Sequence, residues 1–219
     1  WQYAFNNWKF FLALAMPVIA IETLTGYLVV PLGEMTQPED IIGFFETNSL
    51  VISLVGIVGV IIQISFMGGM WVGFMSIDSG KDINPINALQ AGLSKFFPLF
   101  GAYFIVTIAA AFGFLLLILP GIYLLARFSL IVAQVMYEDN KVFESIRASW
   151  EKTDEYGSKL FMFTLIFAGL IFTSSIILTS VIPSGILQLF ILAVVEYIFV
   201  VPLGLSLIHI SEPTRPLTI

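Results

Sequence analysis

Long apolar runs alternate with short polar segments along the whole chain. A helix that spans a bilayer needs about 20 mostly apolar residues, and six runs meet this requirement. They cover residues 10–32, 49–77, 97–118, 121–137, 160–182 and 186–205. The pattern therefore predicts an all-α, polytopic membrane helix bundle with six transmembrane helices, and it predicts that residues 1–205 form a single six-span membrane domain.

The connections between the runs predict how the spans pair. Pro120-Gly121 joins the third span to the fourth, and Pro183-Ser184-Gly185 joins the fifth to the sixth. Joints this short make the two spans antiparallel neighbours. The first two spans are joined by the polar, acidic segment 33–48, so we expect three hairpins.

Two polar segments carry a helical pattern of their own. Asn84-Pro85 is a typical helix start, with a capping side chain followed by proline in the first turn, and it predicts a short helix over 84–95. A second short helix is predicted over 141–153, with an apolar face formed by Phe143, Ile146 and Trp150. We expect both helices to lie flat on the cytoplasmic interface or to cover the inner ends of the bundle, with that apolar face turned inward.

Composition agrees with a membrane protein. The chain of 219 residues is 58% hydrophobic and 11% charged, whereas soluble domains contain roughly 25% charged residues. Its mean hydropathy is +0.99. The bilayer is therefore the first expected partner, and the lack of a basic cluster argues against nucleic acid as another.

The basic residues predict the orientation of the bundle. In a six-span arrangement they all fall on one side, which the positive-inside rule assigns to the cytoplasm. We therefore expect a multi-pass protein of the cytoplasmic membrane with both termini cytoplasmic. The residues concerned are Lys9, Lys81, Lys95, Lys141, Arg147, Lys152 and Lys159.

The last fourteen residues, 206–219, do not continue the pattern. They resemble translated sequencing-adapter read-through, which does not contribute to a fold. We expect this tail to be non-native, including His209, which is the single histidine of the chain.

Three charged residues lie inside predicted spans, namely Glu22, Arg127 and Glu196. A charge at the bilayer centre costs about 2.5–3.5 kcal/mol, so such residues face the bundle interior and pair. We expect one cluster in which Arg127 pairs with one or both glutamates, with Gln63, Gln134 and Gln188 as further polar partners. The cluster could fix the register of the helices, or it could line a path for a substrate or a proton. The fourth span is expected to be an unbroken helix, which favours the structural role.

The residue types needed for catalysis are scarce. With His209 set aside and no cysteine present, the chain has no His/Cys metal set, and it contains no nucleophile elbow or phosphate loop. The sequence predicts no catalytic residue, no metal site and no cofactor, and therefore not an enzyme.

The segment from Leu119 to Trp150 resembles a known signature. An apolar span that begins with Pro-Gly and contains an arginine is followed by a glutamate and a surface helix ending in Ser-Trp. This resembles the membrane-domain family of glycerophosphoryl diester phosphodiesterases and the related YciC-type inner-membrane proteins. The matching positions are Pro120, Gly121, Arg127, Glu138, Ser145, Ser149 and Trp150. The resemblance implies a bacterial or archaeal cytoplasmic-membrane protein without catalytic residues in this domain.

Two classes of function remain open from the sequence. The first is a non-enzymatic scaffold or accessory component of envelope or lipid-linked processes, with other membrane proteins or a soluble enzyme domain as partners. The second is a small transporter or permease that uses the intramembrane charges. A transporter should have a cavity that reaches Arg127, whereas a scaffold should seal the charges in close helix contacts.

Overall fold

The structure is a computed structural model that describes residues 5–211, with side chains described up to residue 204. Within this part of the chain, six stretches are long and apolar enough to cross a membrane. This confirms the predicted all-α, multi-pass class. The helices are α2 (Trp8–Val29), η1 (Val30–Glu34), α3 (Pro38–Asp78), α4 (Pro85–Ser94), α5 (Phe96–Leu116), α6 (Ile118–Arg127), α7 (Ile131–Tyr137), α8 (Val142–Lys152), α9 (Gly157–Val181) and α10 (Ile186–Ser211).

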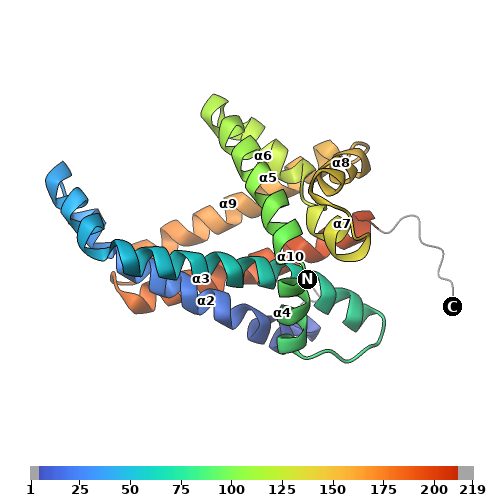
Figure 1. Cartoon of the computed structure of the whole chain (residues 1–219), viewed down its shortest axis with the longest axis horizontal. Helices are drawn as coiled ribbons and strands as arrows, with labels where there is room; N and C mark the ends of the chain where they lie inside the picture. Colours follow the sequence, from blue (N-terminus) through green and yellow to red (C-terminus); the bar gives the residue numbers. More distant parts are fainter. Residues whose placement is uncertain (1–4, 212–219) are drawn as a thin grey trace.

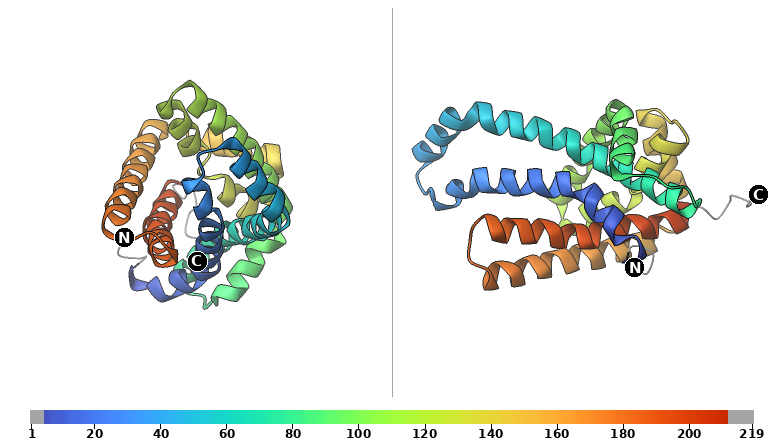
Figure 2. Two further views of the ribbon diagram at one scale, coloured as in Figure 1. Left: turned by 90° about the vertical axis from the view of Figure 1, so that its left-hand side faces the viewer. Right: turned by 90° about the horizontal axis from the view of Figure 1, so that it is seen from below.

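The spans pair as three hairpins. Each hairpin consists of two consecutive spans in contact, namely α2 with α3, α5 with α6, and α9 with α10. Helix α2 also packs on α10. Figure 2 shows α2, α3 and α10 running side by side. In the middle hairpin a Cβ on Gly121 would lie 2.4 Å from the Phe114 ring. Only a glycine permits that approach, so Gly121 lets α5 and α6 pack closely. The expected joint at Pro120-Gly121 is wrong, because the helices meet at Leu117 and both residues lie inside α6.

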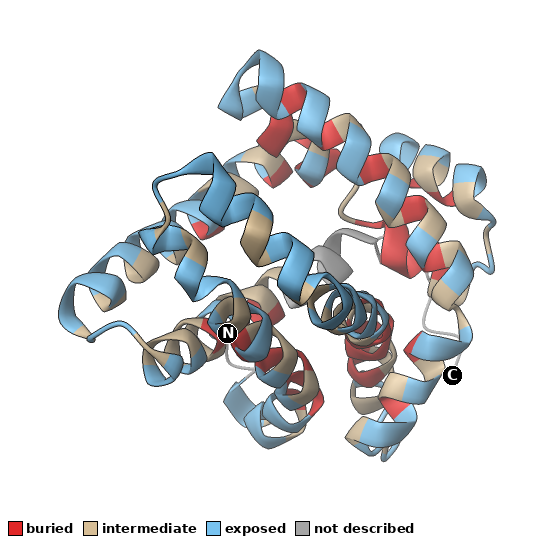
Figure 3. Ribbon diagram, turned by 60° about the vertical axis from the view of Figure 1, so that its left-hand side comes forward, coloured by how far each residue is buried: buried red, intermediate tan, exposed pale blue. Residues whose placement is uncertain are grey.

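The middle hairpin leans away from the other spans (Figure 1). Its tip, residues 115–119, is apolar and exposed, with Leu115 at 81%. Figure 3 shows exposed surface along the outer sides of the helices and buried positions where they meet. Large exposed apolar side chains are what a bilayer requires on a protein surface, so the tip fits a lipid environment.

The second span is longer than its apolar pattern predicts. Helix α3 contains 41 residues, which is about 60 Å at 1.5 Å per residue and roughly twice the hydrocarbon thickness of a bilayer. Pro38 begins the helix and Glu39 and Asp40 stand in its first turn, where acidic side chains interact favourably with the helix dipole. The expectation of a polar connection over 33–48 is therefore wrong for residues 38–48, which extend α3.

The fourth span is not one helix. It ends as α6 at Arg127 and resumes as α7 at Ile131, with a turn over 128–130 between them. Tyr137, at the end of α7, donates a hydrogen bond from its hydroxyl to the Trp71 carbonyl oxygen at 2.7 Å. The expectation of an unbroken helix over 121–137 is wrong.

Both short helices form where they were predicted. The Asn84 side chain accepts a hydrogen bond from the Asn87 backbone N–H at 2.7 Å and so caps α4. On α8 the buried positions are Ser145 and Ser149, whereas Phe143 is 75% exposed and Trp150 is 38% exposed. The expected inward apolar face is wrong for Phe143, because α8 approaches its neighbours through small hydroxyl residues.

The proposed tail is only partly described. Residues 206–211 continue α10 as helical backbone, and their side chains are not described. Residues 212–219 lie outside the described part of the chain.

Candidate functional site

Arg127 lies at the end of α6 and is 3% exposed. Its Nη2 donates hydrogen bonds to the Trp150 carbonyl oxygen at 2.7 Å and to Asp154 Oδ1 at 2.9 Å. Its Nη1 contacts the Tyr123 hydroxyl oxygen at 3.2 Å. A cation near the last carbonyls of a helix is stabilising, and Trp150 belongs to the last turn of α8. The arginine of α6 therefore caps the end of α8.

The contact also runs the other way. The Arg127 carbonyl oxygen is freed by the end of α6, where helical hydrogen bonds run out. It accepts hydrogen bonds from Ser149 Oγ at 3.0 Å and from Thr153 Oγ1 at 3.1 Å. Each helix end thus satisfies the other, and we call this arrangement the Arg127 junction.

Aromatic rings complete the Arg127 junction. The guanidinium carbon lies 4.2 Å from the centre of a Trp150 ring and 5.9 Å from the Tyr123 ring. Attraction of a cation to a desolvated ring face contributes about 2 kcal/mol. A Cβ on Gly157 would lie 3.0 Å from Arg127 Nη1, so the start of α9 approaches the same guanidinium. The junction therefore joins α6, α8 and α9.

A second group of polar side chains lies beside the junction, between α7 and α8. Glu138 forms an ion pair with Lys152. Gln134, with its amide nitrogen turned toward Glu138, donates to Glu138 Oε2 at 2.9 Å and accepts from Lys152 Nζ at 3.2 Å. On the neighbouring surface Lys95 pairs with Asp139 and lowers the pKa of that exposed carboxyl by hydrogen bonding. The contacts among Gln134, Glu138 and Lys152 hold α7 and α8 together, and the Lys95–Asp139 pair joins the start of α5 to the segment after α7.

The expected pairing of Arg127 with the two glutamates is wrong. Neither Glu22 nor Glu196 takes part in any ion pair among the described residues, or in the hydrogen bonds of Arg127. The physical reason is the break after α6. It places Arg127 at a helix end beside α8. There the Trp150 carbonyl oxygen and Asp154 accept its hydrogen bonds in place of Glu22 or Glu196.

Glu22 has its own partners on α10 and α3. The Tyr197 hydroxyl lies 2.7 Å from Glu22 Oε1 and 3.0 Å from Gln63 Oε1. Tyr197 is 4% exposed, so the link between α2, α3 and α10 is buried at its Tyr197 end. Glu196 is the preceding residue on α10 and has an exposed side chain.

Of the other predicted polar partners, Gln63 shares the Tyr197 hydroxyl with Glu22. Gln134 contacts Glu138 and Lys152 in the polar group beside the Arg127 junction. Gln188 donates from Nε2 to the Ile182 carbonyl oxygen at 2.7 Å and satisfies the end of α9. The predicted cluster is thus divided over three places, each of which satisfies a helix end or a buried side chain.

A groove of about 700 Å³ reaches Glu22. Its lining residues belong to α2, α3 and α5. Glu22 and Gln63 line it together with the aromatic side chains Phe100, Tyr103 and Phe104. The groove combines apolar walls with a few polar groups, which is typical of a small-molecule site.

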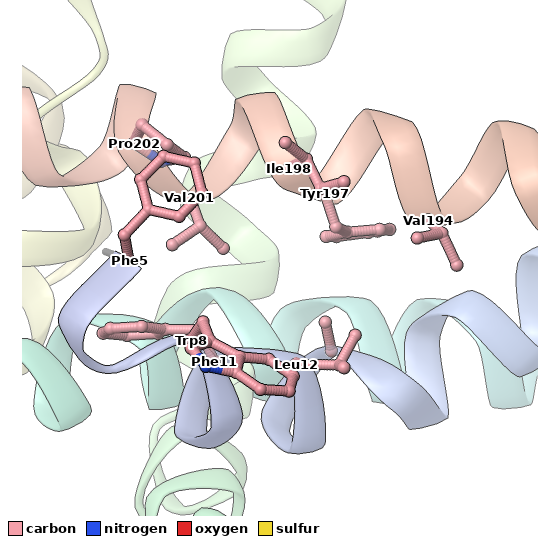
Figure 4. A pocket seen from close by; sticks show the side chains of 10 residues that line it. Phe5, Trp8, Phe11, Leu12, Val194, Tyr197, Ile198, Val201 and Pro202 are labelled. Carbon is pink, nitrogen blue, oxygen red and sulfur yellow. The ribbon is translucent and has the colours of Figure 1, made fainter. Parts of the chain in front are cut away.

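A smaller cavity of about 410 Å³ lies between the beginning of α2 and the middle of α10. Figure 4 shows its apolar lining, including Trp8, Phe11 and Val201. Tyr197 also lines this cavity, while its hydroxyl contacts two residues of the groove. The Tyr197 side chain therefore connects the walls of the two spaces. Arg127 lines neither of them.

Sequence reasoning missed Asp154 and Tyr197. Asp154 lies just after α8 in a polar segment, where an acidic residue carries no distinctive signal. Tyr197 stands beside Glu196 in an apolar run, and its polar hydroxyl near two intramembrane polar residues was a usable signal, because a buried tyrosine hydroxyl usually finds a partner. Among the residues described, no group of three His, Cys, Asp or Glu side chains is placed to hold a metal ion.

Together, the helices define a multi-pass membrane protein in which one buried arginine joins helix ends and one carboxylate faces a groove. Comparisons of the chain with family models, with curated proteins and with solved structures find no match.

Proposed function

We propose that the chain is a non-enzymatic scaffold or accessory component of the cytoplasmic membrane that serves envelope or lipid-linked processes. The observation that carries this proposal is the Arg127 junction. It uses the buried arginine to hold α8 rigidly against the bundle, while Phe143 remains 75% exposed and the Arg147–Glu151 ion pair points outward. A fixed helix with an exposed aromatic residue beside charges is suited to bind a partner, since aromatic residues and arginine are enriched in binding surfaces.

We propose further that the chain is related to the membrane domains associated with glycerophosphoryl diester phosphodiesterases and to YciC-type proteins. Support comes from the position of the signature residues. Gly121 lets α5 and α6 pack closely, Arg127 and Trp150 form the junction, and Ser149 binds the Arg127 carbonyl. The signature residues thus have structural roles in one part of the bundle. Related proteins that share this part can bind different partners, including a soluble enzyme domain.

Photo-crosslinking tests the proposed docking surface. With a photoreactive phenylalanine analogue at Phe143, we expect one discrete protein adduct in living cells. The matched control is Leu116 at the hairpin tip, which is apolar and 78% exposed and should yield lipid adducts. Lipid adducts alone at Phe143 would contradict the scaffold proposal and indicate that α8 only anchors to the membrane surface.

The proposed orientation has a separate test. The chain has no cysteine, so single cysteines can be introduced without a background. A membrane-impermeant thiol reagent added from outside the cell should label a cysteine at Thr36 or Gln37, which lie in the outer connection. It should leave Ser79 and Lys152 unlabelled. External labelling of Lys152 would place the Arg127 junction on the wrong side of the membrane.

A small transporter is the second candidate function. It is favoured by the groove that reaches Glu22, because intramembrane carboxylates commonly mark substrate or ion paths. In this form the path does not use Arg127, whose hydrogen bonds are made within the junction.

A further inference from the structure

The groove beside Glu22 has a chemistry that the scaffold role does not use. Glu22 lines it without a basic partner among the described residues. A carboxylate in a low-dielectric bundle requires a compensating positive charge or a proton. The groove is therefore complementary to a positively charged occupant.

The walls of the groove narrow the choice of cation. Phe100 and Phe104 stack along α5 with ring centres 6.1 Å apart and an interplanar angle of 21°, and Tyr103 lines the same space. Aromatic faces attract organic cations. A bare metal ion requires several oxygen ligands, and the polar lining here is limited to a few side chains on apolar walls.

The size of the groove supports the same conclusion. Sites for drug-sized ligands enclose roughly 300–1,000 Å³, and this groove measures about 700 Å³. It lies among membrane-spanning helices, so its occupant must also partition into the bilayer. An acyl chain would fill the apolar part but would leave the Glu22 carboxylate without a positively charged partner.

We propose that this groove binds a lipophilic organic cation, such as a quaternary or protonated amine shielded by apolar groups, with Glu22 as the counter-ion and Phe100, Tyr103 and Phe104 as the aromatic wall. This site is independent of the docking surface at Phe143, so either proposal can fail without the other.

The test uses the full chain in nanodiscs of uncharged phosphatidylcholine, with binding to empty nanodiscs subtracted. The probes are tetraphenylphosphonium and tetraphenylborate, which share their shape and differ in the sign of their charge. We expect saturable binding of one tetraphenylphosphonium per chain, and much weaker binding of tetraphenylborate. Comparable binding of both probes would show an apolar pocket for lipid only and would overturn the proposal, and this comparison needs no variant.

Substitutions test whether Glu22 and Tyr103 bind the cation. Glu22→Gln keeps a hydrogen-bonding group for Tyr197 and should weaken tetraphenylphosphonium binding by about tenfold or more, since it removes a desolvated counter-ion. Tyr103→Leu should weaken it by about threefold to tenfold through loss of a ring face. The control is Glu46→Gln, which removes an exposed carboxylate from the outer part of α3 and should leave binding unchanged. Unchanged affinity in Glu22→Gln, or an equal loss in Glu46→Gln, would assign the binding to general surface charge and overturn the proposal.

Discussion

Replacing Arg127 with leucine should lower the stability of the folded chain by about 2–4 kcal/mol. The substitution removes charged hydrogen bonds to the Trp150 carbonyl and Asp154, and it removes the cation that faces the Trp150 ring. It does not strand a buried carboxylate, because the Asp154 side chain is 76% exposed and remains solvated. The expected loss therefore comes from a helix end left without its cap.

The measurement is the midpoint of thermal unfolding in detergent, followed by tryptophan fluorescence, together with the yield of monodisperse protein. Arg147→Leu is the matched control, because the Arg147 side chain is 81% exposed in its pair with Glu151 and exposed pairs contribute little to stability. Arg127→Lys should lie between the two, since a lysine keeps the charge without the planar, forked donor geometry. Equal effects of Arg127→Leu and Arg147→Leu would contradict the structural role of the junction.

The second large effect is expected at Gly92, where α4 crosses α3. A Cβ at this position would lie 2.1 Å from the Ser65 carbonyl oxygen and 2.7 Å from the Gly69 backbone nitrogen. Backbone atoms cannot move aside as a flexible side chain can, so Gly92→Ala should push α4 away from α3. Overpacking of this kind costs about 1–3 kcal/mol, and Gly92→Val should cost more.

Gly56→Ala is the control for Gly92→Ala. It lies within α3, and no atom lies within 4 Å of its added Cβ. Alanine is better than glycine inside a helix by about 0.5–1 kcal/mol, so the control should unfold at the same temperature or slightly higher. Loss of stability in Gly56→Ala comparable to that in Gly92→Ala would show that the effect arises from the helix and not from its contact with α4.

The spacing of Gly69 and Gly73 in α3 shows one limit of sequence reasoning. Gly69 and Gly73 have the spacing that allows two helices to approach, but they face different neighbours. A Cβ on Gly69 would meet the backbone of Ala88, and one on Gly73 would meet the Phe10 ring. Spacing identifies small residues on one helix face, whereas the neighbour that uses each of them depends on the tertiary arrangement.

The spans and the two short helices could be predicted because apolar length and capping residues act locally. The break after Arg127 could not, because Phe128, Ser129 and Leu130 contain neither proline nor glycine and stand within an apolar run. That break follows from contacts formed later in the chain, where Ser149 and Thr153 bind the Arg127 carbonyl. An uninterrupted apolar run can therefore contain a helix end when its hydrogen-bond partners lie more than twenty residues away in the sequence.

Sequence reasoning identified two residues of the candidate site, but not their partners. The cost of a charge in the bilayer identifies Glu22 and Arg127 as residues that need partners, and both have them. Which partners they take depends on the depth and rotation of each helix. Arg127 lies at a helix end beside α8, and Glu22 faces Tyr197 and Gln63, so two separate sites replace the single expected cluster.

A pair of double-mutant cycles tests the Arg127 junction most directly. Unfolding free energies would be measured for Arg127→Met combined with Trp150→Leu, and for Arg127→Met combined with Glu22→Gln. The junction predicts a coupling of about 1–2 kcal/mol between Arg127 and Trp150, and a coupling below about 0.5 kcal/mol between Arg127 and Glu22, as for residues without contact. Strong coupling of Arg127 to Glu22, with none to Trp150, would contradict the junction and restore a single intramembrane charge cluster.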